Sequence, residues 1–385
     1  MEKLYAKITE PPIKLRVCEP LMKGNELKYV TEAVETNWIS AQGRFVNEFE
    51  EKFSAFCDTK YGISTTSGTT ALHLALHTLG IGPGDEIIIP SFTMVACAYP
   101  ITYTGAKPVF VDSEKETWNL DPSKIEDMIT KRTKAIMAVH LYGFPAEMDW
   151  INDIAEDYGL WVVEDSAEAH GATYKGKKTG SLGDLGCWSF YANKIIMTGE
   201  GGMITTNNET LAEKARYYKD LCFLKNKRFW HKDIGFNYRM TNLQAAIGVA
   251  QMEYADELVE LRRKNAYIYN KLLTELSETQ SGLILPPEKD YAKNVYWMYS
   301  ILVAKEFGIS RDELRVALRK KGIETRRFFY PLHTQPIYRD RDDLQNYPVA
   351  ETLSETGINL PSSSGLQEDD IAFVVQSIVD AVSGR

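Results

Sequence analysis

Between about residues 60 and 210 the chain alternates helix-like stretches with short apolar runs, and this alternation constrains the fold more than any other feature. Two of the intervening stretches, residues 121–132 and 148–159, carry helix-capping signals and are expected to be helices. Buried parallel strands, covered on both faces by helices, have such continuous apolar runs. We therefore predict a doubly wound α/β domain with a mainly parallel sheet. The strand-like runs are DEIIIP, AKPVFVD, KAIMAVHLYG, LWVVEDS and GMITTN.

The pattern changes near residue 241. A charged helix-like stretch covers residues 241–276 and ends before a Pro-Pro pair. A strand, a helix capped at Ser310, another strand and a last helix follow. We predict a large α/β domain over residues 14–250 and a smaller α+β domain over residues 251–385. The first dozen residues receive no role.

Charge and composition exclude several classes of protein. Lys and Arg number 44 against 53 Asp and Glu, so the net charge of -9 does not suit nucleic-acid binding. No run approaches the roughly 20 apolar residues of a membrane helix, and the first residues lack the apolar core of a signal peptide. We expect a cytoplasmic protein. Its 5 scattered cysteines lack a C-x-x-C pair, which predicts reduced thiols and no metal site.

Ligands of open α/β sheets bind beyond the carboxyl ends of the strands, and three such ends carry unusual residues. At the first, Ser67, Gly68 and Thr69 open an amphipathic helix. Free backbone N–H groups, small hydroxyls and the positive end of the helix dipole suit a phosphate. An ordinary helix cap is the alternative.

At the second strand end, Glu164 and Asp165 directly follow the apolar run LWVV. A carboxylate there either caps the next loop or pairs with a buried cationic ligand atom. A charge pair at about 4 Å is worth roughly 4 kcal/mol at an effective dielectric near 20, which can hold a heterocyclic nitrogen protonated.

The third strand end contains Lys194, between an aromatic run at residues 188–191 and the apolar residues 195–197. Such crowding desolvates an amine and lowers its pKa, which favours attack on a carbonyl because only the neutral amine is nucleophilic. A solvated lysine is the alternative, since most lysines are exposed.

A phosphate-binding turn, a strand-end aspartate and a buried lysine are together the three parts that a pyridoxal phosphate enzyme requires. The chain resembles the nucleotide-sugar aminotransferases, which have the aspartate-aminotransferase fold called fold type I. That resemblance implies pyridoxal phosphate as cofactor, glutamate as amino donor and a nucleotide-linked ketosugar as acceptor. It rests on TSGTTALHLAL, EDSAEAHGA, SFYANKIIMTGEGGM, FNYRMTNLQAAIGVAQ and FFYPLHTQPIY, within a span from NELKYVTEAVETNWIS to GINLPS.

The resemblance implies roles for individual residues. Lys194 matches the lysine that binds the cofactor covalently, and Asp165 matches the partner of the pyridine nitrogen. Glu168 would lie near the phenolic oxygen, and Phe92 would stack on the ring. The other cofactor contacts would be Ser67, Gly68, Thr69 and Ser189, with Asn237 reaching the phosphate of a neighbouring subunit. Such shared sites imply a homodimer, or a tetramer that contains it.

Substrate contacts are expected at four further residues. Tyr330 and His333 are candidates for the sugar, whereas Arg228, in the basic loop 225–233, and Arg326 suit a nucleotide diphosphate. A loop that meets only solvent is the alternative for Arg228. The stretches KRFWH, FNYRMTN and FFYPLHTQP are most similar to the branch that aminates GDP-4-keto-6-deoxymannose. UDP-linked, dTDP-linked and eight-carbon acid sugars are open alternatives.

Other classes fit less well. Dehydratases of the family carry His where this chain has Lys194, and a nicotinamide oxidoreductase needs a G-x-G-x-x-G turn that the chain lacks after its first strand. A non-catalytic cofactor-binding regulator is a third class. His73 and His77 have no evident third ligand, so packing or surface roles are expected. The charged residues 253–264 are predicted to form a solvated helix face.

Overall fold

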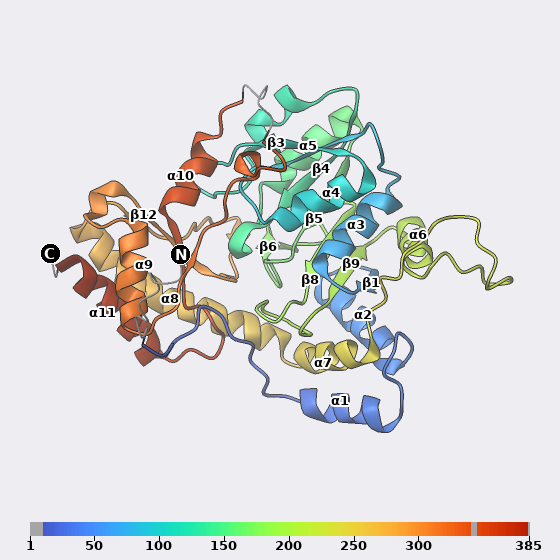
Figure 1. The fold of residues 1–385 in the computed structure, drawn as a ribbon, viewed down its shortest axis with the longest axis horizontal. Coiled ribbons are helices and arrows are strands. Elements are labelled where there is room, and N and C mark those ends of the chain that lie inside the picture. Colours follow the sequence, from blue (N-terminus) through green and yellow to red (C-terminus); the bar gives the residue numbers. More distant parts are fainter. Residues whose placement is uncertain (1–10, 340–344, 384–385) are drawn as a thin grey trace, which may run out of the picture.

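The computed structural model describes residues 11–339 and 345–383, and a seven-stranded sheet lies at its centre (Figure 1). The strand order is β1-β9-β8-β5-β4-β2-β3, and β9 runs in the direction opposite to the other six strands. The predicted mainly parallel sheet is confirmed. The strands are β1 (Tyr61–Thr65), β9 (Gly202–Thr206), β8 (Leu185–Ser189), β5 (Trp161–Asp165), β4 (Thr133–Val139), β2 (Glu86–Pro90) and β3 (Lys107–Val111).

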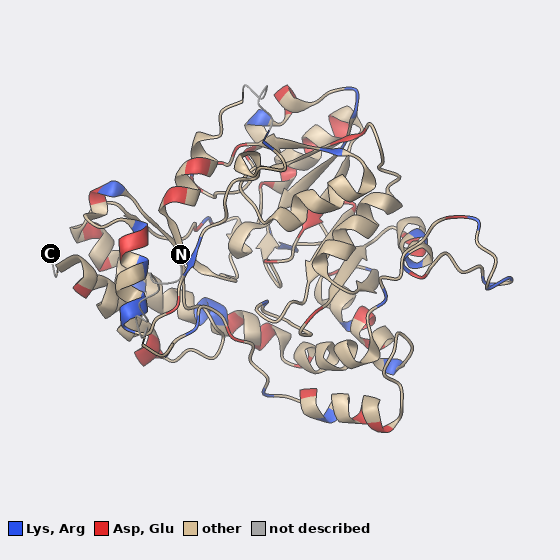
Figure 2. Ribbon diagram, in the orientation of Figure 1, with Lys and Arg blue, Asp and Glu red and all other residues tan. Residues whose placement is uncertain are grey.

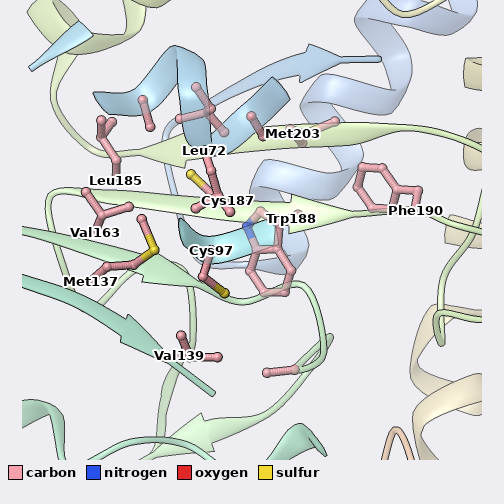
Figure 3. Close-up of a cluster of buried hydrophobic side chains, with 14 of the residues drawn as sticks. Leu72, Cys97, Met137, Val139, Val163, Leu185, Cys187, Trp188, Phe190 and Met203 are labelled. Atoms are coloured by element: carbon pink, nitrogen blue, oxygen red, sulfur yellow. The ribbon is translucent and has the colours of Figure 1, made fainter. Parts of the chain in front are cut away.

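Both faces of this sheet are buried. Ile87 and Ile89 of β2 pack in one core with helices α3 and α4, whereas Ile88 packs in another with α5. Figure 3 shows the first of these cores, where Leu72 of α3 meets side chains from β4, β5, β8 and β9. Because successive strand residues face opposite sides, burial of both faces explains the continuous apolar runs.

The helices of this part mostly follow the predicted pattern. The expected helix over residues 148–159 is α5, which ends at Gly159 in the left-handed conformation. The expected helix over residues 121–132 is wrong, because two short 3-10 turns replace it, at Pro122–Lys124 and Glu126–Met128. The helices are α1 (Glu26–Glu35), α2 (Arg44–Phe56), α3 (Gly68–Thr78), α4 (Ala98–Thr104), α5 (Met148–Tyr158), α6 (Glu209–Lys219) and α7 (Asn242–Met252).

The predicted helix over residues 241–276 is two helices. It breaks between α7 and α8 at Glu253 and Tyr254, where Tyr254 has φ -138 and ψ 29. The first half of α8 packs with the large core and the second half with a separate apolar cluster. The single helix α8 therefore joins two packing units.

That separate cluster lies beneath a four-stranded antiparallel sheet of order β10-β12-β14-β13. Strands and helices mix here as expected for the smaller α+β part. The elements are α8 (Ala255–Thr279), β10 (Leu283–Ile284), β12 (Tyr299–Val303), α9 (Arg311–Lys320), β13 (Arg326–Arg327), α10 (Pro348–Thr356), β14 (Gly357–Leu360) and α11 (Glu368–Ser383). A small third sheet contains β6 (Thr173–Tyr174), β7 (Lys177–Lys178) and β11 (Ala292–Lys293).

The domain boundary at residue 250 stays a prediction. Near the amino end, Leu15 bridges to Ile323, and the carbonyl of Val17 accepts a hydrogen bond from the backbone N–H of Ser362 at 2.8 Å. This segment contacts both packing units, because Val17 is part of the large core and Leu15 packs against the separate cluster. No helix within residues 11–339 and 345–383 has the length and hydropathy to cross a membrane.

Candidate active site

A cavity of about 440 Å³ lies at the carboxyl ends of the parallel strands. The last residues of β4, β5 and β8, which are Val139, Asp165 and Ser189, all line its wall. Ser67, which follows β1, and Lys194, which follows β8, also line the cavity, so all three strand ends chosen from the sequence meet at one site. The predicted residues that line the cavity are Ser67, Gly68, Thr69, Asp165, Glu168, Ser189, Lys194 and Arg326.

The first component of the site is the start of α3. The hydroxyl of Ser67 accepts a hydrogen bond from the N–H of Thr70 at 3.2 Å, and the hydroxyl of Thr70 accepts one from the N–H of Ser67 at 3.0 Å. A Cβ at Gly68 would lie 2.8 Å from the Cβ of Ser189. Only glycine fits there, and the first N–H groups of α3 keep no partner inside the helix. The helix cap and the phosphate site, posed as alternatives, are thus compatible.

Asp165 and Glu164 face opposite sides of the sheet, because they are neighbours on β5. Glu164 is buried and accepts hydrogen bonds at 2.7 Å from the N–H groups of Gly180, Leu182 and Gly183. Its carboxylate also lies 2.9 Å from Nε2 of His140. Glu164 therefore holds a loop, and Asp165 is the carboxylate that faces the cavity.

Two hydrogen bonds orient the Asp165 carboxylate. Its Oδ1 accepts from the N–H of Ala167 at 3.1 Å, and its Oδ2 accepts from the thiol of Cys97 at 2.9 Å. Cys97 was not singled out from the sequence, where only its burial was expected.

The Lys194 amine is covered by Trp297, which lies just before β12 and belongs to the large core. Its Nζ lies 3.6 Å from the ring centroid of Trp297 and 3.8 Å from Oε1 of Glu168. Burial lowers the pKa of Lys194, while the carboxylates of Glu168 and Asp165 act in the opposite direction. The expected desolvation is present, but Trp297 supplies a large part of the enclosure and sequence reasoning missed it.

Glu168 lies beside this amine. Its Oε2 accepts a hydrogen bond at 2.7 Å from the N–H of Tyr142. Burial raises the pKa of Glu168 to about 7, against the opposing effect of the Lys194 charge. Near neutral pH the carboxyl group can therefore either hold or release a proton.

Phe92 does not have the position expected for a stacking residue. Its ring is only 1% exposed, lies outside the cavity lining and contacts the rings of Phe328 and Phe329 at 5.8 and 6.3 Å. Met94, two residues later, is 46% exposed and lines the cavity. Within this chain Met94, and not Phe92, is therefore the residue of this segment that faces the cavity.

His333 and Tyr330 also lie outside the cavity lining. The ring of His333 stacks on Tyr347, its Nδ1 is 2.7 Å from the hydroxyl of Ser91, and its Nε2 is 3.3 Å from Glu351. These contacts occupy the imidazole, which does not face the cavity of its own chain. Tyr330 is 52% exposed and hydrogen-bonds to Arg327.

Arg228 and Asn237 are exposed and do not line this chain's cavity. Arg228 belongs to a loop between α6 and α7 that projects from the body of the protein and carries several basic residues (Figures 1 and 2). Its guanidinium lies over the ring of Phe223, 5.1 Å from the centroid. Asn237 accepts a hydrogen bond from Arg239 at 3.0 Å. Within one chain these residues are separate from the site.

Arg262 corrects the prediction of a solvated face at residues 253–264. It is buried and donates hydrogen bonds to the carbonyl of Trp297 and the hydroxyl of Ser364, each at 3.0 Å. Arginine at this point of α8 therefore fixes the segment that carries Trp297. A charged pattern alone did not distinguish this arginine from its exposed neighbours.

The remaining predictions concern histidines and cysteines. His73 and His77 pack against Phe236, with ring centroids at 4.9 and 5.0 Å. All cysteines are free thiols, and all except Cys18 are buried. In the part of the chain that the structure describes, no group of three or more His, Cys, Asp or Glu residues could hold a metal ion.

The donor set suits pyridoxal phosphate. The start of α3 offers backbone N–H groups to a phosphate, Asp165 offers a carboxylate to a ring nitrogen, and Lys194 offers an amine to an aldehyde. The three groups approach the cavity from separate elements. Its volume, about 440 Å³, is in the range of small-molecule sites.

Comparison with known proteins agrees with this geometry. A model of the DegT/DnrJ/EryC1/StrS aminotransferase family matches residues 20–379. The chain is 47% identical over 367 residues to the GDP-perosamine synthase of Caulobacter vibrioides, covering 95% of this chain and 97% of that protein. It is 44% identical to the GDP-perosamine synthase of Escherichia coli O157:H7, covering 96% and 99%.

A solved structure shows the same fold. DesV from S. venezuelae, crystallised with a ketimine intermediate, superposes with a TM-score of 0.86 at 32% identity, covering 93% of this chain and 94% of that one. The match extends over both packing units. The chain therefore belongs to the DegT/DnrJ/EryC1/StrS aminotransferase family and is a pyridoxal phosphate-dependent nucleotide-sugar aminotransferase.

Proposed function

We propose that this enzyme transfers the amino group of glutamate to GDP-4-keto-6-deoxymannose and so forms GDP-perosamine, a precursor of surface polysaccharide such as lipopolysaccharide O-antigen. The names of the two relatives from C. vibrioides and E. coli O157:H7 support this substrate. The observation that carries the chemistry is the meeting of Lys194, Glu168 and Asp165 at one enclosed cavity.

Each residue has a proposed role toward the cofactor. Asp165 pairs with the ring nitrogen and keeps it protonated, since a buried carboxylate favours the charged form of a neighbouring base. Glu168 lies near the phenolic oxygen, and the start of α3 with Ser189 binds the phosphate. When bound, pyridoxal phosphate supplies an electron sink for the bond that breaks at the amino acid's α carbon.

Lys194 moves the proton. Its Nζ, once free, takes the proton from the α carbon of glutamate and delivers it to the neighbouring carbon of the cofactor. The lowered pKa of this amine favours the neutral form that can accept a proton. The ketosugar enters the same cavity in the second half-reaction, so ping-pong kinetics are expected.

The proposed enzyme is a homodimer with shared sites. Asn237 would reach the cofactor phosphate of the partner, and Arg228 would bind the nucleotide diphosphate there. Both residues are exposed and absent from the lining of this chain's own cavity, which supports the proposal. Phe229 and Ile234 in the same projecting segment are each 84% exposed, and a second copy would cover them.

Borohydride reduction followed by peptide mapping tests the role of Lys194. The reduced cofactor should be found on the peptide that contains Lys194. Lys219 is an internal control, because it is also largely buried but pairs with Glu50 at 2.8 Å outside the cavity. Cofactor on Lys219, or on neither lysine, would reject the assignment.

A substrate panel tests the sugar. GDP-, UDP- and dTDP-linked 3-keto and 4-keto sugars, together with an eight-carbon keto acid, would be assayed with glutamate. The highest kcat/KM should belong to GDP-4-keto-6-deoxymannose. A higher kcat/KM for a UDP- or dTDP-linked sugar would contradict GDP-perosamine as the product. The aminotransferase activity itself would still stand.

Substitution in the projecting loop tests the nucleotide site. Arg228→Ala should raise KM for the GDP-sugar by about tenfold or more and KM for glutamate by less than about twofold. Lys225→Ala is the matched control, because Lys225 is exposed on the same loop. Equal effects of Arg228→Ala on both substrates would contradict the proposed contact.

A further inference from the structure

The contact between Cys97 and Asp165 has no role in the chemistry described so far. Cys97 ends a 3-10 turn, Val95–Cys97, that leads into α4, and its thiol reaches the end of β5. The sulfur lies 2.9 Å from Oδ2 of Asp165 and is 1% exposed. The turn thus brings a donor to the cavity from a distant part of the chain.

The thiol is the donor in this contact. Burial, followed by the charge of Asp165, raises the pKa of Cys97 well above its usual range, so the sulfur keeps its proton. The hydroxyl of Thr93 lies 3.1 Å from the same sulfur and is also buried. Because the other oxygen of Asp165 already accepts from Ala167, each carboxylate oxygen has one donor.

We propose that Cys97 is a positioning residue, whose thiol holds the Asp165 carboxylate in the orientation that pairs with the ring nitrogen of the cofactor. The inference rests on the proposed role of Asp165. A thiol is a weak donor, so it can fix the direction of the carboxylate without withdrawing much of its charge. A cationic donor at this place would compete with the ring nitrogen for the same carboxylate.

Cys187 is a matched control within the same cavity. It is 1% exposed, and it lies on β8 directly beside Asp165 in the sheet register. Within the described residues its thiol makes no hydrogen bond. Replacement of Cys97 or Cys187 by Ala removes the same buried group, and only the first change removes the contact with Asp165.

The decisive measurement is the protonation of the bound cofactor's ring nitrogen. Wild type, Cys97→Ala, Cys97→Ser and Cys187→Ala would be loaded with pyridoxal phosphate labelled with nitrogen-15 in the ring and titrated by NMR. In Cys97→Ala the ring nitrogen should lose its proton about one pH unit lower, the tenfold effect of a lost hydrogen bond to a charged group. Cys97→Ser restores a donor and should titrate close to wild type.

Two results would overturn the inference. One is a Cys97→Ala titration that coincides with Cys187→Ala. The other is a shift to higher pH, which would mean that the thiol withdraws charge instead of orienting the carboxylate. If Cys97→Ala does not fold, Cys97→Val fills the space of the thiol without a donor and carries the same expectation.

The experiment also separates this inference from the assignment of Asp165. A wild-type ring nitrogen that is unprotonated near neutral pH would reject the assignment itself. A protonated ring nitrogen in wild type, with no difference among the variants, would reject only the role of Cys97.

Discussion

The indole ring of Trp297 lies over the amine of Lys194, with 3.6 Å between the ring centroid and Nζ. Its Nε1 donates a hydrogen bond at 2.8 Å to the carbonyl of Asn193, the residue before the lysine. Trp297 therefore both covers the reactive amine and holds the backbone that carries it. This contact joins the segment just before β12 to the reactive amine, which follows β8.

Loss of this ring should affect stability and turnover together. Trp297→Ala should lower the unfolding free energy by about 3–5 kcal/mol and reduce kcat by about tenfold or more. Trp297→Phe keeps an aromatic ring and loses the hydrogen bond of Nε1, so the unfolding free energy should fall by about 1 kcal/mol. Denaturant unfolding and steady-state kinetics measure the two effects. Trp118→Phe, in the buried core outside the cavity, should alter stability alone; a comparable fall in its kcat would contradict this argument.

Asp165 and Glu164 are neighbours with different roles, and their amide variants should separate catalysis from folding. Asp165→Asn should reduce kcat by about a thousandfold, because a charge pair worth roughly 4 kcal/mol is lost. Glu164→Gln should lower the unfolding free energy by about 2–3 kcal/mol, because three backbone donors lose a charged acceptor. Its kcat per folded molecule should change little. Near-native kcat in Asp165→Asn would reject the assigned role.

Glu168 should make the stability of the cofactor-free protein depend on pH. Its pKa in the folded state is raised from 4.5 to about 7, so its contribution is complete below pH 4.5 and is lost as the pH rises through 7. Relative to Glu168→Gln, the wild-type unfolding free energy should fall by about 3 kcal/mol across that window. Denaturant unfolding at several pH values measures it. Glu278→Gln, at an exposed position of α8, is the control and should show the same dependence of unfolding free energy on pH as wild type. If Glu168→Gln also showed the wild-type dependence, the prediction would be refuted.

His170 should have the opposite dependence. Its ring is buried among Phe53, Trp188 and Phe190, and neither nitrogen has a hydrogen-bond partner among the described residues. Burial lowers its pKa to about 3, so stability is lost as the pH falls below the unfolded value of 6.5. Between pH 8 and pH 5, the unfolding free energy of His170→Phe should therefore rise by about 2 kcal/mol relative to that of wild type. The change in packing affects the unfolding free energy equally at both pH values. If the difference between His170→Phe and wild type did not change with pH, titration of His170 would be excluded.

Local sequence patterns predicted many of the strands and helix ends, because these features depend mainly on residues that are neighbours in the sequence. Continuous apolar runs marked β2, β4 and β5, and Ser310 with Glu313 forms the expected capping box of α9. The predicted helix over residues 121–132 is wrong because the prediction depended on a polar capping signal. The segment has little capacity to bury an apolar helix face. Two short turns satisfy the same backbone groups.

Side-chain direction after a strand could not be predicted in the same way. Residues 92 and 94 both follow β2, but contacts with Phe328 and Phe329, more than 230 positions away, hold Phe92 out of the cavity. His333 is bound in the same manner to Ser91 and Glu351. The spacing of a motif predicts which residues lie at a strand end. It does not predict which of their side chains point toward the ligand.

The sequence by itself determined the class of chemistry, because Lys194, Asp165 and the turn at Ser67 each follow a strand of one parallel sheet, whose carboxyl ends meet at a single edge. Tertiary structure alone decided what surrounds those groups. Trp297 above the amine, Cys97 on the carboxylate and Arg262 beneath the Trp297 segment come from distant parts of the chain. Their positions follow from packing between elements, which no local pattern of residues records.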